Sequence, residues 1–190
     1  FMIENVKMKK EFEEYITTHT ENALGEVHKI LINSAMVSAQ NRNRYYWTSF
    51  EVEQPDNKGI LLKDIIEQIT DKKYILSNKM MNGFFYKKGD FGKRFKPLEV
   101  NKSKKANTLT ARYFKMAITD NYLTIGDTDL NGYGITTRKL TPRECFRLQT
   151  VPEHHIDTLL NAGISNTQLY KMCGNGWTMD VIAHIFKGLK

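Results

Sequence analysis

Cysteine is scarce in this sequence. Only Cys145 and Cys173 occur among 190 residues, and they lie far apart in the chain. So few thiols exclude a disulfide framework and a cysteine-based zinc cluster. They favour a reducing, cytosolic setting, and no metal site is expected.

Long apolar runs and a leader segment are missing as well. No stretch approaches the ~18 consecutive apolar residues that a membrane helix needs. Residues 1–10 mix apolar and charged side chains, which is not the pattern of a signal peptide. No membrane partner is therefore expected. The first residue is Phe1 rather than methionine, so we expect the chain to be a piece of a longer protein.

Acidic residues are scarce between Lys72 and Lys115. That segment holds thirteen Lys or Arg residues and two acids, a net charge of +11, whereas the whole chain carries +7. Such a block predicts a basic module that faces a polyanion, attached to a body with another task. A solvated lysine-rich surface is the alternative. The aromatic rings among the lysines weigh against it: Phe84, Phe85, Tyr86, Phe91 and Phe95.

Before about residue 57 the apolar pattern is that of an α/β fold. Strands are predicted around Met2–Val6, Ile30–Ile32 and Tyr45–Val52, and a short helix over Glu11–Ile16. The segment LLKDIIEQI at 61–69 then has apolar residues at helical spacing, which predicts a helix. Beyond it the chain becomes irregular and rich in glycine, lysine and aromatic residues.

The last third of the chain has well-marked helix ends. Thr141 predicts an N-cap, Pro142 the first helical position and Glu144 a capping box. Ser165 predicts a second N-cap, with Gly174 as the stop of that helix. Thr178 predicts a third N-cap. The apolar face of that last helix comprises Val181, Ile182, Ile185, Phe186 and Leu189.

Four short motifs follow one another along the chain. They are FMIENV at 1–6, QNRNR at 40–44, RKLTPRECFRLQ at 138–149 and GNGW at 174–177. Each is weak alone: a strand end with a chance acid, a solvated loop, a capped helix and a common glycine turn. Only their order and spacing make them specific.

In this order the motifs resemble the C-terminal half of the DNA cytosine-5 methyltransferases, and in style the bacterial and phage relatives of the eukaryotic de novo enzymes. The resemblance spans the whole chain. It implies an α/β fold: a partial Rossmann-like class I S-adenosylmethionine-dependent methyltransferase domain with an inserted, mostly irregular target recognition domain. Residues 1–57 and 136–190 would form the catalytic parts, and residues 58–135 the recognition domain. A bacterial or phage-infected cytoplasm would be its location.

The chemistry of cytosine agrees with this resemblance. Methylation at C5 requires the base to leave the duplex, because its reacting atoms are stacked and paired. A cysteine thiolate attacks C6, and a carboxylic acid at ring N3 stabilises the charge that builds on the ring. Glu4, between Ile3 and Val6, is placed in sequence for that role. By the resemblance, Arg44 would bind cytosine O2 and steady Glu4, and Asn5 belongs to the same catalytic motif.

Gln40, Arg42 and Arg44 occupy alternate positions. In an extended loop such residues point to one side, so the three can converge on one ligand. By the resemblance, Arg42 is counted with the catalytic residues and Gln40 with those that contact DNA. Both would support the loop or touch the DNA backbone.

The basic segment takes the role of a DNA reader in this family. Its lysines would neutralise phosphates of duplex DNA, which makes affinity fall with salt. Within ANTLTARYFK at 106–115, the resemblance points to Thr108, Thr110 and Arg112 as DNA-contacting residues. Which of them touches a base edge depends on loop geometry.

The turn at 174–177 belongs to cofactor binding in this family. Asn175, Gly176 and Trp177 would line an S-adenosylmethionine pocket. Many relatives have Ser-Val where this chain has Gly176 and Trp177, so a hydroxyl contact is lost and the indole would pack on the cofactor. The alternative is that Trp177 is a core side chain.

The family's nucleophile and its main cofactor loop are both absent. No Pro-Cys pair occurs, and no Gly-x-Gly turn precedes the ENV motif. Cys145 and Cys173 lie in predicted helices and do not match the catalytic loop. The partner we expect, besides duplex DNA, is therefore a missing N-terminal half of the enzyme, in the same chain or in a second subunit.

Several alternatives stay open at this point. The chain could be the C-terminal part of a truncated methyltransferase, one half of a split enzyme, or a non-catalytic DNA-binding subunit derived from the family. In isolation we expect it to be inactive. A tRNA methyltransferase of the same fold is a further rival, although the long basic insert fits the DNA enzymes better. Target sequence, oligomeric state and a role in restriction-modification are not decided by the sequence.

Overall fold

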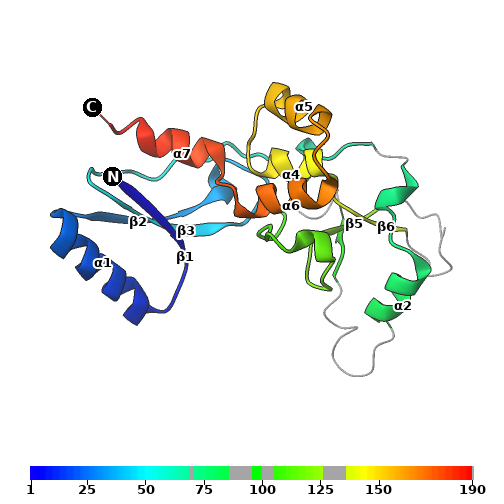
Figure 1. The fold of residues 1–190 in the computed structure, drawn as a ribbon, viewed down its shortest axis with the longest axis horizontal. Helices are drawn as coiled ribbons and strands as arrows, with labels where there is room; N and C mark the ends of the chain where they lie inside the picture. The colour runs from blue at the N-terminus through cyan, green and yellow to red at the C-terminus, as the bar shows by residue number, and fades with distance from the viewer. Residues whose placement is uncertain (69–70, 86–95, 100–104, 126–135, 190) are drawn as a thin grey trace.

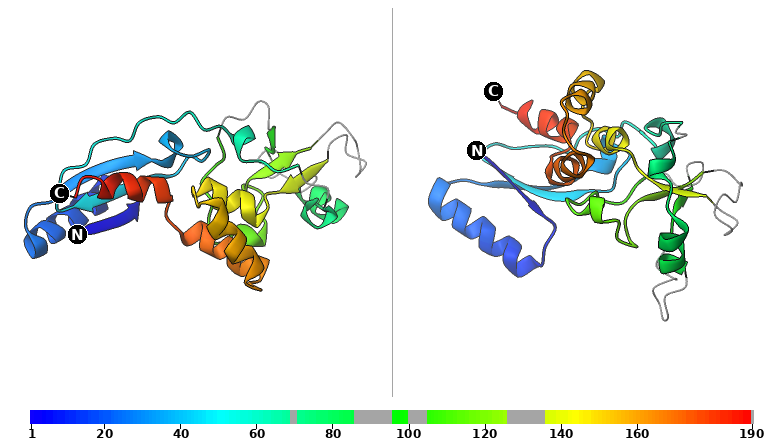
Figure 2. Two further views of the ribbon diagram at one scale, coloured as in Figure 1. Left: turned by 90° about the horizontal axis from the view of Figure 1, so that it is seen from above. Right: turned by 45° about the vertical axis from the view of Figure 1, so that its right-hand side comes forward.

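The structure, a computed structural model, describes residues 1–68, 71–85, 96–99, 105–125 and 136–189. Two bodies lie side by side along the long axis (Figure 1). One contains a sheet with helices α1 and α7, and the other contains helices α2, α4, α5 and α6 and a second sheet (Figure 2). Three of the aromatic residues named above lie outside the described residues, namely Tyr86, Phe91 and Phe95, and so does the side chain of Phe85.

The first sheet has three strands, β1 (Met2–Val6), β2 (His28–Asn33) and β3 (Asn43–Thr48). Their spatial order is β1-β3-β2, and β3 runs antiparallel to both neighbours. β1 and β2 are therefore parallel to each other, and helix α1 (Lys10–Leu24) connects them as a crossover. The three predicted strands are confirmed. Helix α1 is longer than the predicted range Glu11–Ile16. The third strand ends at Thr48, before the predicted end at Val52.

The two faces of this sheet are covered by different helices. Alternate residues of a strand point to opposite faces, so Trp47 faces one side and Tyr46 the other. Trp47 donates its indole N–H to Thr17 Oγ1 of α1 over 2.8 Å. On the opposite face lies helix α7 (Met179–Phe186). The apolar core there comprises Ile32, Val37, Tyr46, Val181 and Ile185.

The second body is built mainly from the last third of the chain. Its helices are α2 (Asn78–Phe85), α4 (Pro142–Leu148), α5 (Glu153–Asn161) and α6 (Asn166–Asn175). Its strands are β4 (Leu98–Glu99), β5 (Tyr122–Thr124) and β6 (Thr137–Lys139), in the order β4-β5-β6. Single 3₁₀ turns occur at Ser34–Met36 (η1), Leu62–Asp64 (η2), Lys72–Tyr74 (η3) and Tyr113–Lys115 (η4).

The hydrophobic core of the second body joins segments from both sides of the predicted boundary at residue 136. Leu62, Leu109 and Leu123 pack in one cluster with Phe146 of α4 and Tyr170 of α6. The cores therefore group α4, α5 and α6 with the predicted recognition segment, whereas the sequence prediction places residues 136–190 with the catalytic part. Of the helices after residue 136, α7 alone packs on the first sheet among the described residues.

The capping prediction for α4 is confirmed. Thr141 Oγ1 accepts from the Glu144 N–H, and the Glu144 carboxylate accepts from the Thr141 N–H. Arg138 also binds that carboxylate with both Nη atoms, over 2.8 and 2.7 Å, in an ion pair whose side chains are 1% and 0% exposed. This bidentate pair joins strand β6 to the start of α4.

Two helix predictions are wrong in detail. The segment 61–69 forms only the short turn η2 in its described part, because partners from α4 and β6 take its backbone groups. Arg147 donates to the Ile65 carbonyl, and the Glu67 N–H donates to the Glu144 carboxylate. Helix α6 continues through Gly174 to Asn175, and Gly176 is its C-cap. None of the helices in the described part of the chain is long and apolar enough to cross a membrane.

Gly174 is a close backbone contact between two segments of the molecule. A Cβ placed there would lie 2.1 Å from the Thr110 carbonyl carbon and 2.2 Å from the Ala111 nitrogen. Both neighbours are backbone atoms, which cannot turn aside as a flexible side chain can. Helix α6 therefore touches the 106–112 segment backbone to backbone.

We predict that Gly174→Ala destabilises the fold by at least about 2 kcal/mol, because overpacked sites cost ~1–3 kcal/mol even where neighbours adjust. The matched control is Gly83→Ala in α2, where a Cβ meets nothing within 4 Å. Since alanine is favoured over glycine within helices, the control should be neutral or stabilising. Urea unfolding of both variants measures the difference. Equal midpoints for the two would contradict this account.

Candidate functional site

Glu4 and Arg44 meet on neighbouring strands of the first sheet. Arg44 Nε lies 2.8 Å from Glu4 Oε1, and the two side chains are 14% and 19% exposed. The register places Glu4 opposite Tyr46 and Val6 opposite Arg44, so the pair forms a diagonal contact on the face that α7 also covers. The structure therefore brings together the two residues that the sequence predicts to act on one ring.

Tyr46 lies beside this pair. Burial raises the pKa of its phenol, and the nearby Glu4 carboxylate raises it further. The phenol is therefore neutral next to the ion pair. Tyr46 is itself part of the apolar core that packs against α7.

Asn5 is not brought to the pair. It lies opposite Tyr45 and so faces the α1 side of the sheet, away from Glu4. Its side-chain oxygen accepts the N–H of Val6 over 2.8 Å. This contact holds the end of β1, and a catalytic role for Asn5 stays a prediction.

Arg42 is buried, and its hydrogen bonds go to backbone carbonyls rather than to Glu4. Only 3% of the surface of Arg42 is exposed to solvent. Nη1 donates to the Leu109 carbonyl over 3.1 Å, and Nη2 donates to the Gly174 and Gly176 carbonyls over 3.3 and 3.0 Å. Burial and the charge of Arg44 lower the pKa of the guanidinium to about 10, which keeps it charged at neutral pH. In this structure Arg42 holds three backbone carbonyls, as expected for a residue that supports the loop, and its place among the catalytic residues stays a prediction.

Gln40 is likewise part of the interior. It is 0% exposed, its Oε1 accepts from the Leu109 N–H over 2.8 Å, and its Nε2 donates to the Leu148 carbonyl over 3.0 Å. These bonds fit the expected role of Gln40 in supporting the loop, and DNA contact by Gln40 stays a prediction. The predicted convergence holds for Gln40 and Arg42, which both bind Leu109, while Arg44 turns to Glu4.

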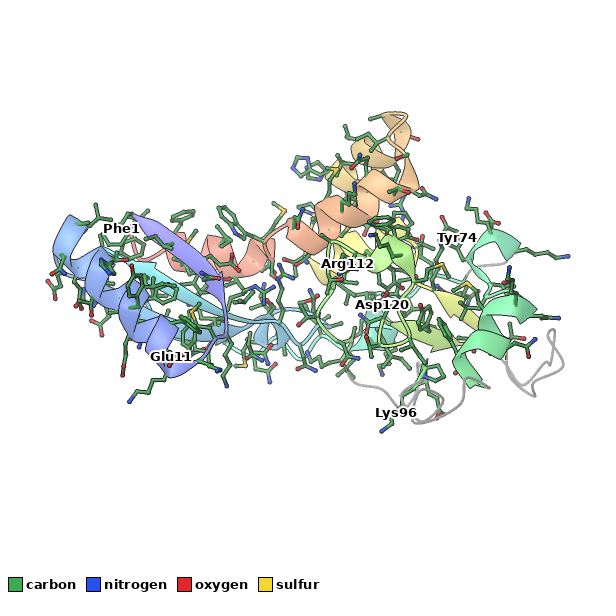
Figure 3. All side chains as sticks on the ribbon, turned by 60° about the horizontal axis from the view of Figure 1, so that its bottom comes forward. Phe1, Glu11, Tyr74, Lys96, Arg112 and Asp120 are labelled. Carbon is green, nitrogen blue, oxygen red and sulfur yellow. The ribbon has the colours of Figure 1, made fainter. Side chains whose placement is uncertain are left out.

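The segment from Ala106 to Arg112 begins beside residues 39–41, which precede β3. Ala106 pairs with the chain at residues 39–41 through two backbone bonds of 2.7 and 2.8 Å. Thr108 Oγ1 donates to the Asn41 carbonyl over 2.5 Å, so this hydroxyl is already engaged. Thr110 and Arg112 are exposed, and Figure 3 labels Arg112. Of the three predicted DNA-contacting residues here, these two present their side chains to solvent.

A second layer of polar contacts supports that segment. The Asn121 side chain binds Asn107 twice, accepting from its N–H over 2.8 Å and donating to its carbonyl over 2.9 Å. Tyr113 donates its hydroxyl to the Asn121 carbonyl over 2.5 Å and accepts the N–H of Leu140. Sequence reasoning missed both residues, because Asn121 lies outside the quoted motifs and Tyr113, although within ANTLTARYFK, was not singled out there.

The turn at 174–177 opens between α6 and α7. Asn175 is exposed, Gly176 is half-buried and Trp177 is 49% exposed. The alternative that Trp177 is a core side chain is therefore wrong within this chain. Gln149 Nε2 donates to the Cys173 carbonyl over 2.6 Å, and Thr178 Oγ1 donates to Gln149 Oε1 over 3.0 Å. These buried bonds fix the turn while leaving the indole half in solvent.

Both cysteines are buried within the second body. Burial raises the pKa of the Cys145 thiol in α4 and of the Cys173 thiol in α6. A thiol in that state is neither accessible nor ionised, so neither can act as a nucleophile. Within the described residues, no group of three or more His, Cys, Asp or Glu side chains is arranged to hold a metal ion.

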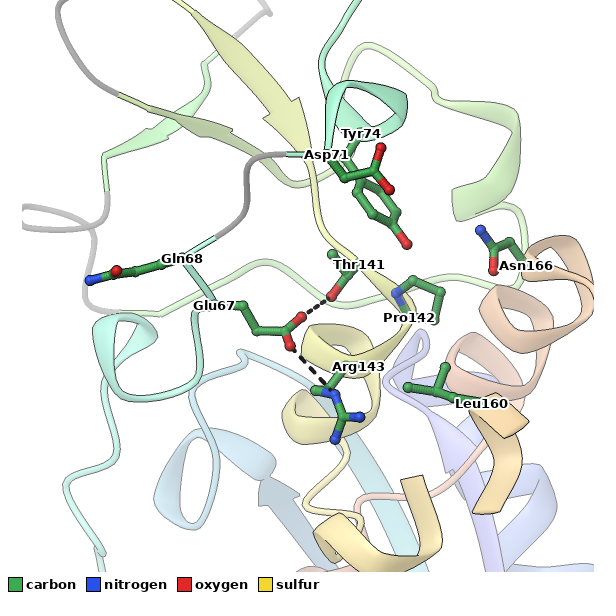
Figure 4. A pocket seen from close by; sticks show the side chains of 9 residues that line it. All are labelled: Glu67, Gln68, Asp71, Tyr74, Thr141, Pro142, Arg143, Leu160 and Asn166. Carbon is green, nitrogen blue, oxygen red and sulfur yellow. Dashed lines mark hydrogen bonds and ion pairs between the residues drawn. The ribbon is translucent and has the colours of Figure 1, made fainter. Parts of the chain in front are cut away.

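A surface pocket of about 360 Å³ lies elsewhere in the second body (Figure 4). Glu67 stands at its wall, accepting from the Thr141 hydroxyl over 2.7 Å and pairing with Arg143 over 3.4 Å. None of the residues predicted for catalysis, cofactor or DNA contact lines it. The pocket is therefore separate from the candidate site.

Comparison with known proteins places this geometry in context. The family model for C-5 cytosine-specific DNA methylases matches residues 1–190. The type II methyltransferase M1.ScrFI of Lactococcus lactis subsp. cremoris is 31% identical over 96% of this chain and 49% of its own length. The type II methyltransferase M.NlaX of Neisseria lactamica is 28% identical over 100% of this chain and 62% of its own length. The chain thus spans about half to three fifths of these relatives.

The fold also matches solved structures. The Entamoeba histolytica methyltransferase EhMeth superposes with a TM-score of 0.70 at 19% identity, covering 100% of this chain and 62% of that one. The Spodoptera frugiperda DNMT2 mutant E260A/E261A/K263A superposes with a TM-score of 0.71 at 20% identity, covering 98% of this chain and 65% of that one. The predicted fold class, part of a Rossmann-like methyltransferase fold, is confirmed.

The carboxyl of Asp120 predicts that the stability of the fold depends on pH. Asp120 accepts the Ala117 N–H over 2.7 Å in the turn before Asn121, and burial raises the pKa of its carboxyl from 3.8 to about 6. Between about pH 4 and pH 6 the folded state holds a proton that the unfolded state releases, so stability falls as pH rises through that window. Asp120→Asn should therefore be more stable than the parent at pH 7, by about 1 kcal/mol after allowance for partial exposure.

The measurement is urea unfolding of parent and variant at pH 4 and pH 7. The advantage of Asp120→Asn should be present at pH 7 and absent at pH 4. Asp56→Asn, at an exposed position, controls for the general loss of one negative charge. An equal advantage at both pH values would refute the role of Asp120 burial.

Proposed function

Because the chain belongs to the C-5 cytosine-specific DNA methylase family, we propose that it is the C-terminal part of a DNA cytosine-5 methyltransferase. The complete enzyme would transfer a methyl group from S-adenosylmethionine to C5 of a cytosine flipped out of duplex DNA. The observation that carries the proposal is the Glu4–Arg44 pair, held at 2.8 Å on adjacent strands. An acid and an arginine at that spacing can grip neighbouring atoms of one small ring.

Glu4 and Arg44 would act on the flipped cytosine together. As a thiolate adds to C6, electron density shifts onto the ring at N3 and O2. The Glu4 carboxyl, which must take up a proton for this step, would donate that proton or a strong hydrogen bond at N3, and the Arg44 guanidinium would bind O2. C5 would then be nucleophilic enough to accept the methyl group, after which loss of the C5 proton to a base would expel the thiolate from C6. The ion pair supports this role because each group already orients the other before the base arrives.

The residues of the 174–177 turn fit one wall of a cofactor pocket. S-adenosylmethionine supplies the methyl group in this family. An exposed indole offers an apolar face for a flat or aliphatic part of the ligand, and the exposed Asn175 amide offers hydrogen bonds. Trp177 and Asn175 would hold the cofactor, while Gly176 keeps the turn narrow. A Cβ at Gly176 would lie 2.9 Å from the Met172 carbonyl oxygen.

Duplex DNA would be bound by the second body. Lysines of the basic segment would pair with phosphates, and the exposed Thr110 and Arg112 would approach the DNA. Thr108 would act indirectly, since its hydroxyl is bound to the Asn41 carbonyl. The segment that carries these residues is anchored on residues 39–41, next to the strand that holds Arg44.

The nucleophilic cysteine and the glycine-rich cofactor loop would come from an N-terminal half, in the same chain or in a second subunit. The burial of Cys145 and Cys173 supports this division. The second candidate is a non-catalytic DNA-binding subunit. Against it stands the intact Glu4–Arg44 pair, which simple DNA binding does not require.

The test is methyl transfer by the full-length gene product that contains this chain. Labelled S-adenosylmethionine is supplied with duplex DNA or with tRNA, and label on cytosine C5 is measured. Label in DNA alone supports the proposal, whereas label in tRNA alone favours the RNA enzyme. DNA binding without label in either would favour the non-catalytic subunit.

In that enzyme, Glu4→Gln and Arg44→Ala should each lower turnover by about a hundredfold or more, because each removes a group that stabilises charge in the transition state. DNA affinity should change much less, by about threefold or less, since phosphate contacts dominate it. Arg143→Ala, which removes a half-buried arginine of an ion-pair network in the second body, is the control and should leave turnover near the parent value. Equal losses of turnover and DNA affinity would remove both residues from the catalytic role.

Trp177→Ala should weaken S-adenosylmethionine binding by about tenfold, the loss of roughly 1.4 kcal/mol of ring contact. Phe186→Ala is the matched control, since this aromatic residue of α7 is 44% exposed. Isothermal titration with cofactor alone separates the two variants. The same loss in both would place Trp177 outside the pocket.

A further inference from the structure

Arg42 connects two segments that are far apart in sequence. Its guanidinium binds the Leu109 carbonyl on one side and the Gly174 and Gly176 carbonyls on the other. Under the proposed function, Leu109 lies inside the DNA-reading segment and Gly176 lies in the cofactor turn. One side chain therefore spans the parts that would bind the two substrates.

Gln40 strengthens the grip on the DNA-reading side. Its Oε1 accepts the Leu109 N–H, while Arg42 binds the Leu109 carbonyl. Both backbone polar groups of Leu109 are thus held by two side chains from one short loop, and its own side chain is 1% exposed in the core. Leu109 cannot shift without breaking contacts to residues 40–42.

The two segments also touch each other without an intervening side chain. At Gly174 a Cβ would overlap the backbone of Thr110 and Ala111, so the end of α6 lies directly on the residue after Leu109. Close-packed backbone has little room to absorb a displacement. A shift of the DNA-reading segment would therefore move the end of α6 and the turn that follows it.

We propose that Arg42 is a positioning residue that couples DNA binding at residues 106–112 to cofactor binding at Asn175–Trp177. The inference rests on the proposed function and goes beyond it, because that function requires both sites but no communication between them. The guanidinium is suited to the task since its planar fork reaches acceptors on two sides at once, which an ammonium group does less well. Among the described residues no carboxylate forms an ion pair with it, so its partners are the carbonyls it positions.

The contacts of Arg42 with the Leu109 carbonyl and with the Gly174 and Gly176 carbonyls form the junction between the two segments. Burial makes this junction sensitive to displacement. A covered guanidinium that loses a carbonyl partner keeps an unpaired N–H in the interior, which is unfavourable for a charged donor. The junction should therefore favour the arrangement in which both segments are in place. A ligand that orders one segment then favours binding at the other, and thermodynamic linkage makes the effect reciprocal.

The experiment measures this coupling in the full-length gene product. Affinity for S-adenosylhomocysteine, which binds without reaction, is determined by titration with and without a duplex that the enzyme methylates. For the parent we expect DNA to tighten cofactor binding by about tenfold, and cofactor to tighten DNA binding by the same factor. Arg42→Lys should reduce both factors to about one.

Arg138→Lys is the control, because Arg138 is an equally buried arginine whose ion-pair partner, Glu144, lies within the second body. It should lower stability and keep the tenfold coupling. Loss of coupling in both variants would show that any damage to the interior has this effect, and would overturn the assignment to Arg42. A parent that binds both ligands independently would overturn the coupling and leave the proposed function intact. A parent that binds neither would overturn both.

A second measurement needs no variant at Arg42, in case Arg42→Lys does not fold. The indole of Trp177 is half-exposed next to the Gly176 carbonyl that Arg42 holds. Adding duplex without cofactor should change tryptophan emission in the parent, and Trp177→Phe should remove that change. Identical responses of parent and Trp177→Phe would show that DNA binding does not reach the turn, and would refute the proposal.

Discussion

The bonds from the Arg42 guanidinium to three backbone carbonyls are the contact on which the arrangement of this molecule depends. Each body has its own apolar core, one between the first sheet and α7 and one beneath α4, α5 and α6. Hydrophobic packing is non-directional and does not by itself fix how two such bodies meet. Directional hydrogen bonds at a buried junction do. The position of the Glu4–Arg44 pair relative to the 106–112 segment follows from that junction.

Further polar groups complete the junction. Gln149 joins the Cys173 carbonyl to Thr178, and the Thr178 hydroxyl also lies 2.8 Å from Ser34 Oγ near the end of β2. A satisfied buried network of this kind favours one arrangement, because any other leaves donors or acceptors unpaired. These bonds connect the last turn of α6 to Thr178, the residue that precedes α7. The turn with Trp177 is thereby held by both bodies.

Local signals in the sequence predicted local structure well. The capping box at Thr141 and Glu144 and the three strands follow from patterns of neighbouring residues. The segment 61–69 did not follow its apolar spacing, because Arg147, Arg138 and Glu144 bind its backbone groups from afar. The alternation of residues 40–44 indicated which side chains share a side but not how deeply each lies, so the burial of Gln40 and Arg42 was missed. Depth depends on segments that pack over the loop from more than sixty positions away.

Binding partners distinguish three arginines that the motifs alone do not separate. Arg138 is buried, and both of its Nη atoms bind the Glu144 carboxylate, so it stabilises the start of α4. Arg42 is also buried, but it binds carbonyls of two segments and so holds those segments in alignment. Arg44 is also mostly covered, at 14% exposed, but it is bound to the Glu4 carboxylate on the first sheet. In a mostly covered ion pair the cost of desolvation offsets much of the attraction, so stability alone is a weak reason for this pair, which favours the proposed role at the cytosine ring.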